Sequence, residues 1–218
     1  MILNKEYLKF YFKIKFLNFK RQRFSYTNID LYERDENIIF IHIPKAAGMS
    51  CVKEIFGVEQ SNHAFASDYI KQNKALFEQS FSFSITREPL ERAISAFYYL
   101  KSGGMNEIDK VWNDIFIKPY ENFNDFVICG GLENAIKFNA QHFIPQNHFT
   151  HQNNEQLVKY IGKIEDISSL ESVLSRKLGR KITFPVMNSG KIRKGIVSKE
   201  VEERVSKIYS SDYRIFYP

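Results

Sequence analysis

The 218-residue chain has the composition of a folded soluble protein with an excess of positive charge. Hydrophobic residues make up 44% and charged residues 26%, which excludes an intrinsically disordered chain, and the length suits one domain with additions. The 31 basic residues exceed the 25 acidic ones by six, which favours an anionic partner such as a nucleotide, an acidic glycan, nucleic acid or a membrane surface. No apolar run is long enough to predict a transmembrane helix, and the two cysteines lack the spacing of a metal site or a disulfide framework.

The first 35 residues differ in pattern from the rest of the chain. The stretch YLKFYFKIKFLNFKRQR alternates aromatic residues with lysines and ends in a basic cluster, without the cleavage site of a signal peptide. Its apolar residues fit both a helix and a strand. The segment is therefore either a helix on an anionic membrane or an ordinary element packed on the domain. We expect residues 1–35 to form an extension and residues 36–218 to form the domain.

From residue 38 onward, apolar runs alternate with helical patterns, which indicates βαβ units and a parallel sheet. In the first half we predict a strand at 38–43, a helix from Met49 or Ser50 to Phe56, a helix at 65–77, a strand at 81–86, and a helix from Pro89 to Gly103. In the second half we predict helices at 106–117 and 121–129, a polar loop at 139–154, a strand within 157–166, a helix at 166–178, and a helical segment after Ser198 with Val201, Val205 and Ile208 on one face. The expected fold class is α/β, a P-loop-like three-layer fold with a central parallel sheet flanked by helices.

The segment IPKAAGMS (43–50) joins the first strand to the first helix and has the properties of an anion-binding loop. Small residues let the backbone approach a ligand, the amides of the following helix point at it, and Lys45 adds a positive charge. A P-loop NTPase needs GxxxxGK followed by Ser or Thr, with the lysine at the end of the loop. Because Lys45 precedes the small residues, an ordinary NTPase is disfavoured.

A second polar segment, TREPLERAISAFYY, follows the strand at 81–86. Arg87 stands at the carboxyl end of that strand, where open α/β sheets bind ligands, and Ser95 lies eight residues further on in the next helix. A guanidinium and a hydroxyl there could hold a second phosphate, or Arg87 could pair with a carboxylate while Ser95 packs.

Together, the two segments resemble the sulfotransferases that use 3′-phosphoadenosine 5′-phosphosulfate (PAPS), in particular the Golgi-type carbohydrate sulfotransferases and their bacterial relatives. In that family a PKxxGTS loop holds the 5′-phosphosulfate and an RxPxxRxxSxY-like segment holds the 3′-phosphate. The C-terminal segment VEERVSKIYSSDYRIFYP is similar to the closing helix of the family, so the resemblance runs from about residue 38 to the end. Two positions depart from the pattern: Met49 replaces a threonine and Phe97 replaces a tyrosine.

The resemblance implies a role for each matching residue. Lys45 would neutralise charge on the leaving phosphate oxygen, and Arg87 with Ser95 would bind the 3′-phosphate. Arg193 and Lys194, in SGKIRKG, look like a loop that closes on the 3′-phosphate in cytosolic sulfotransferases, although a solvated basic loop is an equal reading. The implied cofactor-binding residues are Lys45, Ala46, Ala47, Gly48, Met49, Ser50, Arg87, Ser95, Arg193 and Lys194.

A general base must take the proton of the acceptor hydroxyl, and histidine suits that task near neutral pH. His63 is the favoured base, because related carbohydrate sulfotransferases place a catalytic histidine in a similar stretch. His42 is expected to have a core role, His142 and His148 to be next in line and to contact the acceptor, and Glu165 to be structural.

The expected function is therefore sulfuryl transfer from PAPS to a hydroxyl of a glycan, glycolipid or surface polysaccharide, without a metal and without nucleic acid. One alternative is an atypical nucleotide-dependent small-molecule kinase, which would need Mg²⁺. The other is a non-enzymatic protein that binds polyanions or membranes. The composition is typical of a bacterial enzyme, for which we expect a cytoplasmic location, with the inner face of the membrane as the alternative.

Overall fold

The computed structural model describes residues 37–58, 61–184 and 197–218. Its main sheet contains three parallel strands in the order β1-β2-β5, with β2 in the centre. The strands are β1 (Ile38–Ile41), β2 (Phe81–Thr86) and β5 (Tyr160–Lys163). Parallel strands all end at the same edge, so the segments after β1, β2 and β5 meet at one end of the sheet.

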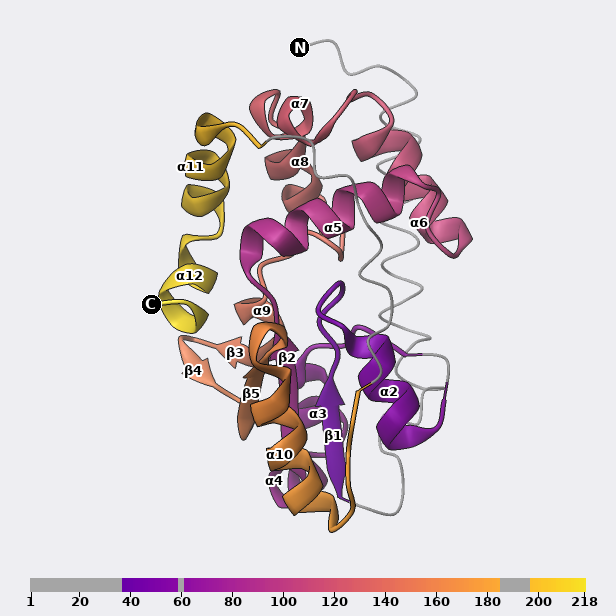
Figure 1. The fold of residues 1–218 in the computed structure, drawn as a ribbon, viewed down its shortest axis with the longest axis vertical. Helices are drawn as coiled ribbons and strands as arrows, with labels where there is room; N and C mark the ends of the chain where they lie inside the picture. Colours follow the sequence, from indigo (N-terminus) through magenta and orange to yellow (C-terminus); the bar gives the residue numbers. More distant parts are fainter. Residues whose placement is uncertain (1–36, 59–60, 185–196) are drawn as a thin grey trace.

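Helices cover both faces of this sheet (Figure 1). On one face, α2 (Gly48–Phe56) and α10 (Ile167–Leu178) pack on Ile38, Phe40, Phe83 and Ile85. On the other face, Ile39 and Ile41 pack on α3 (Ala66–Gln72) and α4 (Lys74–Gln79). The expected three-layer α/β fold with a central parallel sheet is confirmed.

The alternating sequence FSFSIT explains why β2 can occupy the centre of the sheet. Its apolar side chains face α2 and α10, while small hydroxyl residues occupy the opposite face. Ser84 Oγ donates to the carbonyl oxygen of Ile41 at 2.7 Å, and Thr86 Oγ1 donates to that of Gly162 at 3.2 Å. Each buried hydroxyl thus has a partner, which avoids a desolvation cost of about 1–3 kcal/mol per group.

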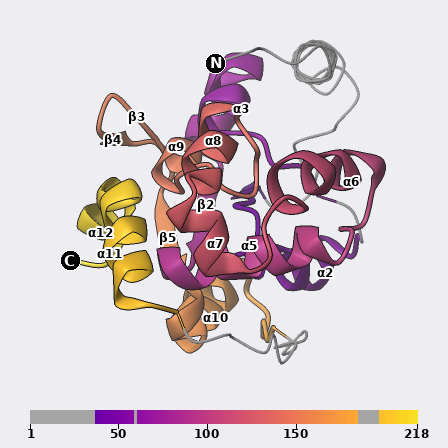
Figure 2. The ribbon, with the colours of Figure 1, turned by 90° about the horizontal axis from the view of Figure 1, so that it is seen from above.

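A second group of helices, which includes α5 (Pro89–Lys101), lies beyond the carboxyl ends of the strands (Figure 1). Its core packs around Phe97, Leu100 and Phe126, which are fully buried. Seen from above, α6 lies on one side of α5 and α11 with α12 on the other (Figure 2). The members of this group besides α5 are α6 (Glu107–Trp112), the π-helix η1 (Asn113–Ile117), α7 (Phe123–Ile128), α8 (Gly131–Lys137), α11 (Lys199–Ile208) and α12 (Ser210–Phe216).

Several predicted elements are divided in the structure. The predicted helix at 65–77 breaks at Asn73, which has an extended backbone and whose side chain caps α4 by accepting from Leu76 N at 3.0 Å. The predicted helix at 106–117 changes into η1, and the C-terminal segment bends at Tyr209 between α11 and α12.

The polar segment at 139–154, predicted as a loop, contains two short regular elements. It includes the single turn α9 (Asn147–Thr150) and the first strand of a small antiparallel hairpin, β3 (His151–Gln152) with β4 (Glu155–Gln156). Helix α8 was also not predicted. Within the described ranges, no helix combines the length and the apolar character needed to cross a bilayer.

Candidate active site

The loop between β1 and α2 holds two non-glycine residues in the left-handed backbone region. Lys45 has a φ of 69° and Ala47 a φ of 58°. This conformation costs roughly 1–2 kcal/mol for an L-residue, and such cost is commonly found at functional sites. The turn is closed by Ala46 N donating to Ile43 O at 3.4 Å and by Ser50 N donating to Ala47 O at 3.2 Å. The backbone of this loop, at the carboxyl edge of the sheet, is therefore locally strained.

Gly48, the first residue of α2, allows the loop to lie directly against His42. A Cβ at this position would come within 1.9 Å of His42 Cδ2 and 2.0 Å of His42 Nε2, so only glycine fits. The structure describes every residue in the first turn of α2, and none of them is acidic. No side chain in the described part of the chain caps the amides of this turn. Uncapped helix amides beside small residues fit a phosphate or sulfate group, which is the group that the sequence predicts here.

Two cations meet at this edge, because β2 ends next to the loop. Arg87 Nη1 donates to the carbonyl oxygen of Lys45 at 3.5 Å, and Arg87 also forms an ion pair with Glu91 at 3.6 Å. Burial, and then the positive charge of Arg87, lower the pKa of Lys45 to about 8, while Asp109 acts in the opposite direction. A bound dianion would compensate the repulsion between the two cations.

The backbone of Arg87 is fixed by a buried glutamine from a distant part of the chain. Gln146 Oε1 accepts from Arg87 N at 2.9 Å, and Gln146 Nε2 donates to Arg87 O at 2.8 Å. Asp212 of α12 in turn accepts the backbone amides of Gln146 at 2.7 Å and Asn147 at 2.9 Å. Gln146 and Asp212 are both fully buried. Helix α12 therefore helps, through Gln146, to fix the backbone position of Arg87.

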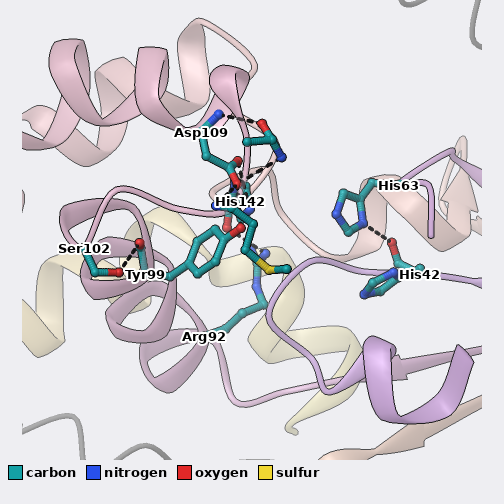
Figure 3. A network of polar contacts seen from close by, with 9 residues as sticks. His42, His63, Arg92, Tyr99, Ser102, Asp109 and His142 are labelled. Carbon is teal, nitrogen blue, oxygen red and sulfur yellow. Dashed lines mark hydrogen bonds and ion pairs between the residues drawn. The ribbon is translucent and has the colours of Figure 1, made fainter. Parts of the chain in front are cut away.

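Three histidines lie in a row beside the loop (Figure 3). The ring of His63 is 4.4 Å from that of His42 and 6.2 Å from that of His142, measured between centroids. His42 is 4% exposed, stacks on Phe40 and hydrogen-bonds Ser61 Oγ through Nδ1 at 2.8 Å. Burial, followed by the charges of its neighbours, lowers the pKa of His42 well below the usual value, so His42 is neutral near pH 7. This environment agrees with the core role expected from the sequence.

The backbone of His42 also determines the tautomer of His63. His63 Nδ1 lies 3.2 Å from the carbonyl oxygen of His42, and a carbonyl can only accept a hydrogen bond. Nδ1 therefore carries the proton in the neutral ring, and Nε2 carries the lone pair that a general base needs. Gln141 Nε2 donates to the carbonyl oxygen of His63 at 3.4 Å and supports this position.

The other histidine candidates have contrasting environments. His142 is 7% exposed, and its carbonyl oxygen accepts from the fully buried Arg92 Nη1 at 3.1 Å. His148 is exposed on α9 and does not belong to the network of Figure 3. Geometry therefore places His63 and His142 close to the loop, and a contact between His148 and the acceptor stays a prediction.

Two residues in the network were not singled out from the sequence. Tyr99 on α5 lies under the Lys45 ammonium. Asp109 on α6 accepts a hydrogen bond from the Tyr99 hydroxyl (Figure 3). The only feature of the sequence that points to Asp109 is the pair Gly103-Gly104 before it, and this pair is equally typical of an ordinary helix end.

The remaining predicted residues are placed as follows. Ser95 is 7% exposed on α5, and its contact with a phosphate stays a prediction. Phe97, which departs from the family pattern, is a core residue packed against Phe126 at a centroid distance of 5.2 Å. Glu165 accepts from Glu88 N at 2.7 Å and from the Tyr217 hydroxyl at 3.0 Å, which are structural contacts. The predicted residues Arg193 and Lys194, and the segment 1–35, lie outside the described residues.

The comparison with known families decides the class of the protein. A family model described as the sulfotransferase family matches residues 31–218. The chain belongs to the sulfotransferase family. Neither a search of curated proteins nor a search of solved structures found a match. The enzymatic reading is thereby confirmed over the polyanion binder and the kinase, and sulfuryl transfer is the reaction class of this sulfotransferase.

Proposed function

We propose that this sulfotransferase moves the sulfuryl group of PAPS to a hydroxyl of a carbohydrate acceptor. The observation that supports this most strongly is the meeting of three groups at one sheet edge: the strained loop with Lys45, the guanidinium of Arg87, and the base tautomer of His63. Each group suits one part of the reaction, namely the phosphosulfate, the 3′-phosphate and the acceptor hydroxyl. The binding loop implied by the family resemblance supports the choice of PAPS over another donor.

On the donor side, the residues present fit the anionic group. PAPS supplies a sulfuryl group attached to a phosphate that leaves as the S–O bond breaks. The backbone amides of Ala47, Gly48 and Met49, which lie between the two amides that close the turn, together with the Ser50 hydroxyl, would hold its oxygens. The ammonium of Lys45 would stabilise the charge that grows on the leaving phosphate oxygen. Arg87 and Ser95 would bind the 3′-phosphate and set the position of the nucleotide along the edge.

On the acceptor side, His63 would remove the proton. Its Nε2 would accept the hydrogen of the attacking hydroxyl as the new S–O bond forms, and its Nδ1 would remain bonded to the carbonyl oxygen of His42. The buried His142 lies on the other side of His63 and would contact the acceptor. The hydrogen bond between His63 Nδ1 and the carbonyl oxygen of His42 supports His63, instead of His142, as the proposed base.

The reaction itself can be tested with a labelled donor. With PAPS labelled with ³⁵S and a panel of oligosaccharides and glycolipids, we expect label in an acceptor and release of adenosine 3′,5′-bisphosphate, with equal rates in EDTA and in Mg²⁺. In the described part of the chain, no three His, Cys, Asp or Glu side chains are grouped as metal ligands, and independence from metal stays a prediction. Transfer of phosphate from ATP that requires Mg²⁺, without transfer from PAPS, would contradict the proposal.

A further inference from the structure

The ammonium of Lys45 lies against an aromatic ring instead of pointing into solvent. Lys45 Nζ is 3.8 Å from the centroid of the Tyr99 ring. A cation on a ring face at this distance is stabilised by about 0.5–2 kcal/mol, depending on how far it is desolvated. Tyr99 therefore holds the Lys45 ammonium at a defined position beside the loop.

Asp109 fixes the ring that Lys45 rests on. Its Oδ2 accepts from the Tyr99 hydroxyl at 2.5 Å, from Met105 N at 3.0 Å and from Asn106 Nδ2 at 3.1 Å. Asp109 is 3% exposed, so these three donors replace the water that its carboxylate has lost. With its hydroxyl tied down, the Tyr99 ring has a fixed orientation under Lys45.

The turn between α5 and α6 is shaped to bring this carboxylate close. Gly104 has a φ of 65°, and a Cβ on it would come within 2.2 Å of Asp109 Cβ. A side chain at position 104 would be strained by its backbone and would also displace Asp109. Gly104 thus ends α5 and also leaves the space that Asp109 occupies.

The same carboxylate also faces the acceptor side of the site. Asp109 Oδ1 is 3.9 Å from His142 Nε2, and the rings of His142 and Tyr99 are 5.2 Å apart. One buried acidic residue therefore contacts both the ring under Lys45 and the ring of His142, and Figure 3 shows Asp109 with Tyr99 and His142.

From these contacts we propose that Tyr99 and Asp109 are positioning residues, which hold Lys45 as an ammonium at the donor site before the donor binds. The functional part of this inference rests on the proposed role of Lys45. The charged and titratable groups that act on Lys45 are Arg87 from the end of β2, Asp109 from α6 and His42 from the end of β1. The charge of Arg87 lowers the pKa of Lys45 and the charge of Asp109 raises it. The protonation of Lys45 therefore depends on both residues.

The inference is tested by an NMR titration of Lys45 in the free protein, without any donor. Lysines are labelled with ¹³C at Cε, and the Lys45 signal is assigned as the one missing from Lys45→Arg. We expect a titration midpoint of about 8 in the wild type. Asp109→Asn, which keeps a hydrogen-bond acceptor but removes the charge, and Tyr99→Leu, which removes the ring, should each lower the midpoint by roughly half a unit to one unit.

Two neighbouring residues provide matched controls. Asp114→Asn removes a charge from η1 that pairs with Lys118, and Tyr98→Phe removes a hydroxyl from the next residue of α5. Both should leave the Lys45 midpoint unchanged. Unaltered midpoints in Asp109→Asn and Tyr99→Leu would overturn the inference, and Asp109→Asn alone decides the matter if Tyr99→Leu does not fold. Because no donor is present, the result is independent of whether PAPS is the substrate.

Discussion

Replacing Lys45 by methionine is expected to lower kcat by about 10²–10³-fold, the usual effect of removing one group that stabilises charge in a transition state. Methionine has a similar length and no charge. A side chain with a Cβ already occupies this left-handed position, so the backbone of the loop should stay as it is. The measurement is the initial rate of ³⁵S transfer, with thermal unfolding recorded to show that the variant is folded. Lys53→Met, on the exposed side of α2, is the control and should keep the wild-type rate.

The dependence on pH offers a second view of the same residue. The pKa of Lys45 is lowered to about 8 by burial and by Arg87, and the proposed role of Lys45 requires its protonated form. The value of kcat/KM for PAPS should therefore fall as the pH rises through about 8, since this parameter reports the free enzyme. Lys45→Arg should move the fall to higher pH. A rate that Lys45→Met leaves unchanged, or a wild-type profile that rises above pH 8, would contradict the role of Lys45.

Replacing His63 by asparagine is expected to lower kcat by about 10²–10⁴-fold, the range typical of a lost general base. The asparagine amide can still donate to the carbonyl oxygen of His42, so the variant should keep the local fold. Donor affinity should change little, because the proposed role of His63 is on the acceptor side. Turnover and binding of adenosine 3′,5′-bisphosphate are therefore measured on the same preparation.

The neighbouring histidines allow the role of His63 to be separated from theirs. His148→Asn, at an exposed position on α9, should leave kcat at the wild-type value, and any effect of the predicted acceptor contact should be confined to KM for the acceptor. His142→Asn should raise KM for the acceptor more than it lowers kcat. If His142→Asn abolishes turnover while His63→Asn retains it, the base is His142 and the assignment to His63 is wrong.

The donor side of the site could be predicted from the sequence because its signals are local. The loop around Lys45 and the segment after Arg87 each lie within a few residues of a strand end, and the alternation of strands and helices places both strand ends at one edge. His42 could be placed in the core for the same reason, since it follows directly on an apolar strand.

The supports of the site could not be predicted, because they join residues that are far apart in the sequence. Gln146 holds Arg87 across 59 positions, and Asp212 holds Gln146 across 66. Glutamine and aspartate are usually exposed, so the sequence alone does not indicate that these two side chains are fully buried. Asp109 has the same difficulty: it reads as an ordinary acidic residue in the first turn of a helix.

The division of predicted helices has a comparable cause. Asn73 sits inside a run of residues with good helical pattern, and its side chain ends one helix and caps the next. An asparagine can end a helix, cap the next one or stay inside a helix. The packing of α3 and α4 on the sheet therefore decides whether the helix breaks at Asn73. The small hairpin of β3 and β4 is equally hard to predict, since each strand has two residues.

The central claim, that this edge of the sheet binds the PAPS nucleotide, is tested most directly by calorimetric binding of adenosine 3′,5′-bisphosphate in EDTA. We expect selective binding over ATP and 5′-AMP, weakened about 10- to 100-fold in Arg87→Ala because a charged hydrogen-bond donor is lost. Arg176→Ala, at an exposed position near the end of α10, should bind like the wild type. Equal binding of ATP, or affinity that Arg87→Ala leaves unchanged, would contradict the account.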